Sequence, residues 1–407
     1  GMFIHGGLYS MPARHEWVMN KERLTDEHYR RYFQRFDPDL YDPAAWARAA
    51  KGAGMKYAVV TSKHHEGFCL WDSAHTDFKA PATPAGRDLL TPLVEAFRAE
   101  GLRVGFYYSL LDWHHPDYPV DRCHPRRDDA EFREKTAGRD VRKYAAYMRE
   151  QVRELLTRFG KIDVIWYDFS FPGENGKGRD DWESEKLLKL TRELQPEIMV
   201  NNRLDLPGSP DFFTPEQFVP AEGLTGEDGR PVVWEGCQTF SGSWGYHRDE
   251  SSWKSVEMLV QMLVDHVSKN GNMLLNVGPT SRGEFDSRAL DRLEDIGRWM
   301  RRHSRAVYGC GASEFTPPRD CRYTQNGNRL YLHFFSWPFR SVHLPGLAGK
   351  VKYAQLLGDG SEIGMREGPR GGGANGKDAP PEGALVLELP PVRPDEVVPV
   401  VELFLGD

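Results

Sequence analysis

The segment Lys161-Ile-Asp-Val-Ile-Trp-Tyr-Asp168 is an apolar run that ends in an acid. Three other apolar runs also lead into polar or aromatic groups: 57–63 into His64-His65-Glu66, 103–109 into Asp112-Trp113-His114-His115, and 197–203 into its own Arg203. Buried parallel strands read as continuous apolar runs, and barrel active sites gather at the carboxyl ends of such strands. The four runs therefore predict one shared pocket.

The order of the predicted elements indicates the fold class. Strands alternate with amphipathic helices over roughly the first three hundred residues, which predicts βα units around a parallel sheet, an α/β fold. Expected strands are 2–9, 57–63, 103–109, 162–168, 196–203, 231–234 and 272–277; expected helices are 88–100, 139–159, 184–194, 253–269, 285–304 and one that Asp42 caps and that ends before Gly54.

The alternation stops near residue 310. Short β-rich runs separated by Gly/Pro turns follow at 328–335, 341–344, 350–353, 384–389 and 397–404, and a glycine-rich run at 371–377 has loop composition. We therefore expect a catalytic domain at 1–310 and a small antiparallel β-domain at 311–407.

Composition excludes some classes of function. A formal net charge of −7 over 407 residues gives no electrostatic footprint for nucleic acid or an anionic membrane surface. No apolar run approaches the length of a bilayer-spanning helix. The five cysteines form no Cys-x-x-Cys pair, so a disulfide framework is not expected. No signal peptide is visible, but a trimmed chain would look the same, so the sequence leaves the compartment open.

Carboxylates at strand ends are the first candidates for chemistry. Asp168 has the position of a nucleophile or general base, although an acid there also serves as a helix cap or orders a loop. Arg203 has the position to clamp a ring hydroxyl or tune a carboxylate, or to pair with a neighbouring helix. Glu216, in the loop after that strand, and Glu235, after Val232-Val233-Trp234, are both candidates for a second carboxylate.

Paired histidines raise the alternative of a metal-dependent barrel hydrolase. His64, His65, His114 and His115 would supply its ligands, together with nearby carboxylates. However, adjacent histidines in a strand point to opposite faces, and their spacing matches no standard zinc pattern. At a strand end both imidazoles can instead donate to substrate hydroxyls, or serve only as structural side chains.

Further segments carry a family resemblance. They are Met2-Phe-Ile-His5-Gly-Gly-Leu-Tyr-Ser10, Glu16-Trp17, Lys63-His-His-Glu-Gly-Phe68, Gly105-Phe-Tyr-Tyr-Ser109, Trp166-Tyr-Asp168, Asn202-Arg203, Trp234-Glu-Gly-Cys237, Ser243-Trp-Gly-Tyr246 and Gly271-Asn-Met-Leu-Leu-Asn-Val-Gly-Pro-Thr280. With these motifs the chain resembles the α-L-fucosidases of glycoside hydrolase family 29. The resemblance implies a (β/α)8-like TIM barrel followed by a C-terminal antiparallel β-sandwich domain.

The resemblance also implies roles for residues. Asp168 corresponds to the retaining nucleophile, and Glu216 is the best match for the general acid/base, with Glu235 second. The positions that match the lining of the fucose pocket are His5, Glu16, Trp17, His64, His65, Tyr108, Trp166, Arg203 and Trp244. One departure is Gly6, where the family usually has Trp. We also expect tryptophan walls to raise the pKa of the acid, and His and Arg donors to keep Asp168 ionised.

The resemblance thus implies an exo-acting retaining α-L-fucosidase that removes terminal fucose from oligosaccharides or glycoconjugates through a covalent fucosyl-enzyme intermediate. It implies no metal and no cofactor. An alternative from another class is a catalytically silent sugar-binding protein. The sequence leaves the fucosyl linkage and the oligomeric state open.

Overall fold

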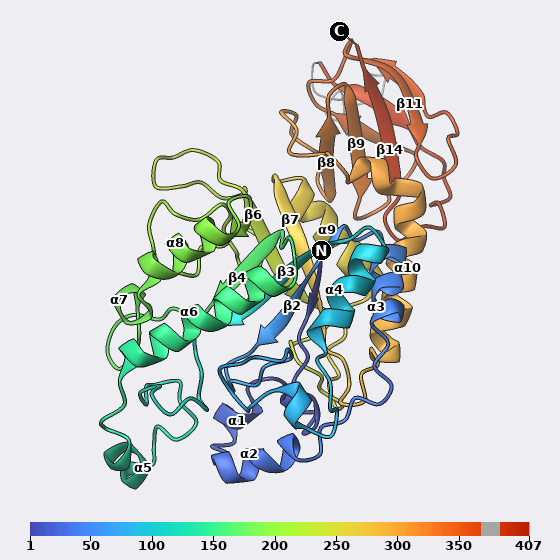
Figure 1. Cartoon of the computed structure of the whole chain (residues 1–407). Coiled ribbons are helices and arrows are strands. Elements are labelled where there is room, and N and C mark those ends of the chain that lie inside the picture. Colours follow the sequence, from blue (N-terminus) through green and yellow to red (C-terminus); the bar gives the residue numbers. More distant parts are fainter. Residues whose placement is uncertain (368–382, 407) are drawn as a thin grey trace. The chain divides into compact units, whose positions relative to one another are not determined.

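The computed structural model describes residues 1–367 and 383–406 (Figure 1). The expected glycine-rich loop at 371–377 lies outside the described residues. The chain divides into two compact units, each discontinuous in sequence. The first consists of Gly1–Gln217, Cys237–Trp253 and Leu274–Leu293, and the second of Phe218–Gly236, Lys254–Met273 and Glu294–Asp407. The expected domain boundary between residues 310 and 311 stays a prediction.

A parallel sheet forms the centre of the barrel-like part. Within the described residues it has seven strands in the order β5-β4-β3-β2-β1-β7-β6, and the ladders from β7 through β1 to β5 are parallel. This order is that of a barrel wound once around, so the predicted TIM-like fold class is confirmed. The strands are β1 Met2–Ile4, β2 Tyr57–Lys63, β3 Arg103–Ser109, β4 Val164–Asp168, β5 Met199–Val200, β6 Trp234–Thr239 and β7 Gly271–Val277.

A short segment continues the sheet beyond β5. Asn201 forms an isolated parallel bridge with Phe212, and four residues later Glu216 forms another with Cys237 in β6. The amide of Cys237 donates to the carbonyl of Pro215, and the amide of Gln217 donates to the carbonyl of Cys237. The segment 212–216 therefore links the edge at β5 to β6, and it carries Glu216 into the ring of strands.

Helices follow the strands as the periodicity predicted. Asp42 caps the helix α3 by accepting from the amide of Ala45 at 2.9 Å. Helix α6 buries one apolar face, including Tyr144 and Met148. No described helix has the length and apolar character needed to cross a bilayer. The helices are α1 Val18–Lys21, α2 Asp26–Phe33, α3 Pro43–Gly52, α4 Leu90–Ala99, α5 Ala130–Lys135, α6 Val141–Arg158, α7 Arg179–Trp182, α8 Ser184–Leu194, α9 Val256–Val267 and α10 Ser287–His303.

The C-terminal strands form two antiparallel sheets, in the orders β10-β13-β12 and β11-β14-β9-β8. Leu332 and Leu403 of the second sheet share one core with Leu344 and Leu387 of the first, so the predicted β-sandwich is confirmed. The strands are β8 Cys321–Asn326, β9 Arg329–Phe334, β10 Ser341–Leu344, β11 Val351–Leu356, β12 Gly364–Glu367, β13 Leu385–Glu388 and β14 Val400–Leu405.

Three predicted strands were wrong in extent. The strand expected at 196–203 is only Met199–Val200. The strand expected at 2–9 ends at Ile4, because the chain turns at Gly6-Gly7 and forms a 3-10 helix at Leu8–Ser10. The strand expected at 231–234 begins only at Trp234 and runs to Thr239. All five cysteines are free thiols.

Candidate active site

Strand alternation selects the side chains inside the barrel. Phe3 of β1, Tyr107 of β3 and Trp166 of β4 pack in one buried cluster, with ring centroids 5.3–5.8 Å apart. Side chains two residues apart in a strand share a face. Asp168, the last residue of β4, therefore continues the row of Trp166 and stands at the carboxyl end of the strand, where the sequence predicted it.

Asp168 is buried and held by two donors. Arg203 Nη1 donates to its Oδ1 at 2.9 Å, and the Tyr107 hydroxyl donates to its Oδ2 at 2.7 Å. One carboxylate oxygen thus bonds a cation and the other a phenol. This pattern fixes the plane of the carboxylate.

Arg203 joins the two predicted carboxylates. Its Nη2 donates to Glu216 Oε2 at 2.9 Å, while its Nη1 bonds Asp168. Burial by itself would lower the pKa of Arg203, but the charges of Asp168 and Glu216 outweigh burial and raise it. The guanidinium carbon lies 4.7 Å from the ring centre of Trp166, a cation–π contact.

Glu216 has a more open position than expected. Its side chain is 43 % exposed and pairs with Arg203, so the expected enclosure of this acid by tryptophan walls is wrong. The competing candidate Glu235 is the second residue of β6 and 6 % exposed, and Asn272 Nδ2 donates to its Oε2 at 3.3 Å. Glu235 therefore lies near the beginning of its strand, not at the carboxyl end as expected.

Three imidazoles lie in ring contact beside Tyr107. The ring of His64 is 4.0 Å from that of His65 and 5.6 Å from that of His5. His5 Nδ1 bonds Asn276 Oδ1 at 2.6 Å, and His65 Nδ1 bonds Ser109 Oγ at 2.7 Å. Burial, followed by the charge of His64, lowers the pKa of His5 to about 3 and that of His65 well below its usual value. His5 and His65 are therefore neutral near pH 7 and able to donate or accept hydrogen bonds.

Glu16 ties the first barrel loop to the segment that carries Trp244. Its Oε2 accepts from the amides of Trp244 and Gly245 at 3.2 and 2.8 Å. Burial would raise the pKa of Glu16, but His15 and the Gly245 amide outweigh it and lower the pKa to about 2. Trp244 in turn packs its ring 5.3 Å from that of His5. Trp17, which follows Glu16 in the chain, has its ring centroid 4.9 Å from that of His65.

Backbone strain accompanies three of the predicted site residues. His15, Phe169 and Gln217 have positive φ angles of 68°, 78° and 62°. They adjoin Glu16, Asp168 and Glu216 respectively. Such conformations cost free energy in non-glycine residues and cluster at functional sites.

At Gly6, the position where the sequence departs from the family pattern, space is restricted. A Cβ atom added there would lie 3.1 Å from Pro279 Cγ. A larger side chain at residue 6 would therefore require Pro279 to shift.

Tyr108 is a correction to the sequence-based set. Its hydroxyl donates to Gln151 Oε1 of α6 at 2.8 Å, because Tyr108 is one residue out of step with the interior row and faces the helices. Tyr107, which we did not predict, takes its place beside Asp168. The register pairs Tyr107 with Trp166, so counting in twos from Asp168 would have identified it.

We expect Tyr107→Phe to lower kcat roughly tenfold or more, because a hydrogen bond to a charged group contributes about 1.5–3 kcal/mol. Tyr108→Phe is the matched control. It should leave kcat nearly unchanged but lower the free energy of unfolding by about 1–3 kcal/mol, since buried Gln151 loses its donor. Steady-state kinetics and urea unfolding of both variants measure these effects. A larger loss of kcat in Tyr108→Phe would restore the original assignment.

The buried histidines also predict a pH dependence of stability. Below pH 6.5 the unfolded chain protonates His5, whereas the folded protein resists protonation until about pH 3. Acid therefore favours unfolding, and the free energy of unfolding should fall as pH drops from about 6.5 towards 3. Urea unfolding at pH 7 and pH 5 tests this, and His5→Gln should show a shallower pH slope. An unchanged slope in that variant would remove His5 as a source of the effect.

The alternative of a metal-dependent hydrolase is not supported by the arrangement of the described side chains. Within residues 1–367 and 383–406, no group of three or more His, Cys, Asp and Glu side chains is placed to hold a metal ion. His114 stacks on Phe78, and His115 packs against Tyr147. His114 and His115 therefore pack against other aromatic rings and do not join the cluster of His64 and His65.

A TIM-like barrel with a carboxylate at the end of β4 and a second one joined to it through Arg203 fits the class of glycoside hydrolases that use two carboxylates. The family model described as Alpha-L-fucosidase matches residues 1–305. The chain belongs to the alpha-L-fucosidase family.

Known α-L-fucosidases are similar to this chain over nearly all of its length. Alpha-L-fucosidase isoenzyme 1 from Paenibacillus thiaminolyticus is 48 % identical, with a TM-score of 0.93 and coverage of 100 % of this chain and 96 % of that one. Plasma alpha-L-fucosidase of Rattus norvegicus is 29 % identical, covering 96 % of this chain and 85 % of the relative. A Bacteroides thetaiotaomicron fucosidase, solved as a trapped covalent intermediate with 2-fluoro-fucosyl fluoride, is 27 % identical, with a TM-score of 0.85 and coverage of 100 % and 94 %. The chain is therefore an α-L-fucosidase, and its substrates are fucosylated glycans.

Proposed function

We propose that Asp168 is the nucleophile and Glu216 the general acid/base, and that the enzyme removes terminal α-L-fucose from oligosaccharides or glycoconjugates. One observation carries this proposal: a single guanidinium, that of Arg203, bonds Asp168 through Nη1 and Glu216 through Nη2, each at 2.9 Å. Retaining glycosidases need their carboxyl groups about 5–5.5 Å apart, whereas inverting enzymes need about 6.5–9.5 Å. Two carboxylates on adjacent nitrogens of one planar group favour the shorter spacing.

In the first step, a carboxylate oxygen of Asp168 attacks the anomeric carbon as the bond to the leaving oxygen breaks. The protonated carboxyl group of Glu216 gives its proton to that oxygen, so the aglycone leaves as an alcohol. Fucose is then covalently attached to Asp168. The Tyr107 hydroxyl donates a hydrogen bond to Asp168 Oδ2, and this bond orients the attacking carboxylate.

In the second step, the carboxylate of Glu216 removes a proton from water, and the oxygen of that water attacks the anomeric carbon. The bond to Asp168 breaks and its carboxylate is regenerated, while Glu216 regains the proton it began with. Two displacements return the anomeric configuration of the substrate. Glu216 suits exchange with water because much of its side chain is exposed.

The surrounding side chains supply recognition. His5 and His65 are buried neutral imidazoles, and His64 lies between them in ring contact, so this cluster offers donors and acceptors to sugar hydroxyls. Trp17, Trp166 and Trp244 offer aromatic surface for the C–H faces and the methyl group of fucose. Glu16 holds the Trp244 segment in place through its amides.

A substrate panel tests the proposed activity and its linkage. The protein should be given an aryl α-L-fucoside and α1,2-, α1,3/4- and α1,6-linked fucosyl oligosaccharides, with the released sugar followed by proton NMR from the first turnover. We expect α-L-fucose to appear before its β anomer. Initial release of the β anomer would contradict the double displacement, and binding of fucose without turnover of the aryl fucoside would favour a silent sugar-binding protein.

A further inference from the structure

Two of the three imidazoles beside Tyr107 have one ring nitrogen bonded to the protein. His5 Nδ1 bonds Asn276 Oδ1 at 2.6 Å, and His65 Nδ1 bonds Ser109 Oγ at 2.7 Å. In a neutral imidazole one ring nitrogen is a donor and the other is an acceptor, so the bond at Nδ1 also determines what Nε2 can do. The other hydrogen bonds of each partner decide which ring nitrogen carries the proton.

Asn276 can only accept from His5. Its Nδ2 donates to the backbone carbonyl of Trp244 at 2.6 Å, and because a carbonyl oxygen cannot donate, the amide is fixed with its NH2 group towards Trp244. The other atom of the amide, Oδ1, faces His5 and is an acceptor without a proton. His5 therefore carries its proton on Nδ1, and its Nε2 has a free lone pair.

Ser109 likewise can only accept from His65. A serine hydroxyl has one proton, and that of Ser109 is donated to the backbone carbonyl of Leu111 at 2.9 Å. Its Oγ therefore has only lone pairs left for the imidazole. His65 is thus also the Nδ1–H tautomer, with a free lone pair on Nε2.

Both imidazoles are neutral near pH 7, as this argument requires. Burial lowers the pKa of His5 to about 3 and that of His65 well below its usual value. His64, the third ring of the cluster, is not fixed in this way, because its Nδ1 is buried without a hydrogen-bond partner among the described residues. The assignment of the tautomer therefore covers His5 and His65 only.

The two Nε2 atoms are available to a ligand. Neither bonds a described residue, and neither is among the buried polar atoms that lack a partner, so each retains accessible surface. The ring centroid of His5 lies 5.6 Å from that of Tyr107, which bonds Asp168. The ring centroid of His65 lies 5.1 Å from that of Phe169, the residue after Asp168. Both imidazoles therefore lie beside the proposed nucleophile.

We propose that Asn276 and Ser109 are positioning residues for the two imidazoles. Each fixes its histidine as the Nδ1–H tautomer, so that Nε2 accepts a hydrogen bond from a hydroxyl group of fucose. A hydroxyl can donate to such an atom, whereas a fluorine or a hydrogen in its place cannot. The pocket therefore selects sugars that bring donors to these two positions. This inference rests on the proposed function, since it takes the pocket beside Asp168 as the fucose site.

Nitrogen NMR of the unliganded protein tests the tautomers without any substrate. The protein is labelled with ¹⁵N-histidine and studied at pH 8, where exposed imidazoles are neutral. We expect His5 and His65 to show a protonated Nδ1 and an unprotonated Nε2, with the signals assigned by their loss in His5→Gln and His65→Gln. A proton on Nε2 of either residue would overturn the proposal but not the proposed function.

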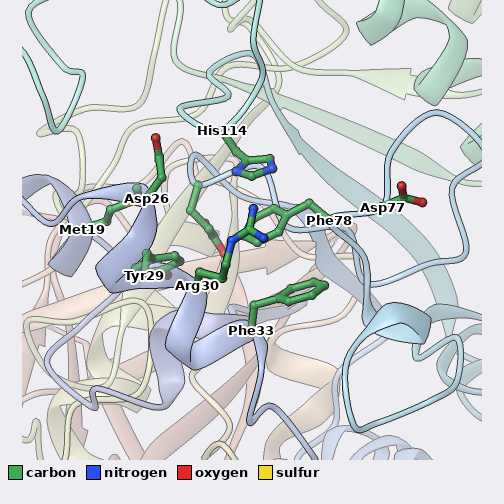
Figure 2. A pocket seen from close by; sticks show the side chains of 9 residues that line it. Met19, Asp26, Tyr29, Arg30, Phe33, Asp77, Phe78 and His114 are labelled. Atoms are coloured by element: carbon green, nitrogen blue, oxygen red, sulfur yellow. The ribbon is translucent and has the colours of Figure 1, made fainter. Parts of the chain in front are cut away.

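His114 provides an internal reference in the same spectrum. Its ring stacks on Phe78 in the wall of a separate cavity beside helix α2, with ring centroids 4.0 Å apart (Figure 2). Neither ring nitrogen of His114 has a hydrogen-bond partner among the described residues. Its ring should therefore populate both tautomers. A single tautomer at His5 and His65 beside a mixture at His114 would support selection by the bonded partners.

Ser109→Ala tests whether the partner fixes the tautomer. The variant removes the acceptor at Nδ1 of His65, so the proton can move to Nε2, and kcat/KM for an aryl fucoside should fall about 3- to 10-fold because one hydrogen bond to the substrate is lost. Ser62→Ala is the matched control. Its buried hydroxyl also donates to a backbone carbonyl, that of Tyr107 at 2.7 Å, but bonds no imidazole.

We expect the control to lose a similar amount of stability while it keeps the tautomer of His65 and the wild-type kcat/KM. If Ser109→Ala keeps the wild-type tautomer, or if both variants lose kcat/KM equally, the proposal is wrong. If Ser109→Ala does not fold, the tautomers of the wild-type protein decide the proposal.

Fluorinated sugars test the acceptor role of the two Nε2 atoms. L-fucose derivatives in which fluorine or hydrogen replaces one hydroxyl at a time are compared as competitive inhibitors of aryl fucoside hydrolysis. At the hydroxyls that meet the two imidazoles, the inhibition constant should rise about 3- to 10-fold, and no less for fluorine than for hydrogen, since fluorine cannot donate. Tighter binding of the fluorine derivative than of the hydrogen derivative at every position would show that the imidazoles donate, and it would overturn the proposal. Absence of aryl fucoside turnover by the wild type would instead contradict the proposed function, and the NMR result would still decide the tautomers.

Discussion

Replacement of Asp168 by asparagine should reduce kcat for an aryl fucoside by about three orders of magnitude or more, which corresponds to at least about 4 kcal/mol of transition-state stabilisation. The amide is nearly isosteric with the carboxylate, and its one oxygen can still accept from Arg203 if its NH2 group donates to the Tyr107 hydroxyl. It cannot form the covalent bond, because its oxygen is a poor nucleophile. Steady-state kinetics with circular dichroism and urea unfolding would separate loss of chemistry from loss of fold.

The matched control is Asp163→Asn, immediately before the same strand. Asp163 Oδ2 accepts from the amide of Val104 at 3.0 Å, and an asparagine oxygen can accept in the same way. We therefore expect near-wild-type activity from this variant. Turnover within tenfold of the wild type in Asp168→Asn would exclude Asp168 as the nucleophile, and equal losses in both variants would attribute the effect to the strand, not to the site.

The sequence was sufficient to predict a strand and the residue at its end where that strand is buried on both faces. Val164–Asp168 is apolar throughout until its last residue, so both its place in the sheet and the acid at its carboxyl end could be predicted. It was insufficient for β6, whose residues Trp-Glu-Gly-Cys-Gln-Thr are all buried in spite of their polar character. Tertiary contacts override strand propensity there. Because the strand was predicted to end at residue 234, Glu235 was expected at its carboxyl end, whereas it lies near the beginning of β6.

The contact of Arg203 with both proposed catalytic carboxylates could not be predicted from the sequence. Glu216 follows Asp168 by 48 positions (216 − 168), and no local pattern predicts that 212–216 bridges Asn201 and Cys237. The contact through Arg203 depends on this long-range pairing. Tyr107 and Tyr108 are a different case, since only the face of the strand was misassigned, and the period of two was available from the start.

Replacement of Glu216 by alanine should lower kcat most for fucosides with poor leaving groups, by roughly 100-fold or more, because general acid catalysis typically contributes about 10²- to 10⁴-fold. An activated aryl fucoside needs little protonation, so its first step should survive and the fucosyl-enzyme should accumulate. Azide needs no general base and should restore turnover. The product should be the fucosyl azide with the configuration of the substrate, since azide attacks opposite the bond to Asp168.

Glu235→Ala is the competing variant and decides the assignment. Because Glu235 accepts from Asn272 near the beginning of β6, we expect this variant to lose stability and to show no azide rescue. The two variants should be compared at equal folded fractions, with azide titrated against an aryl fucoside and a fucosyl oligosaccharide. Rescue of Glu235→Ala alone would transfer the acid/base role to Glu235. Arg203 would then hold Glu216 only to keep the 212–216 segment in place beside Asp168.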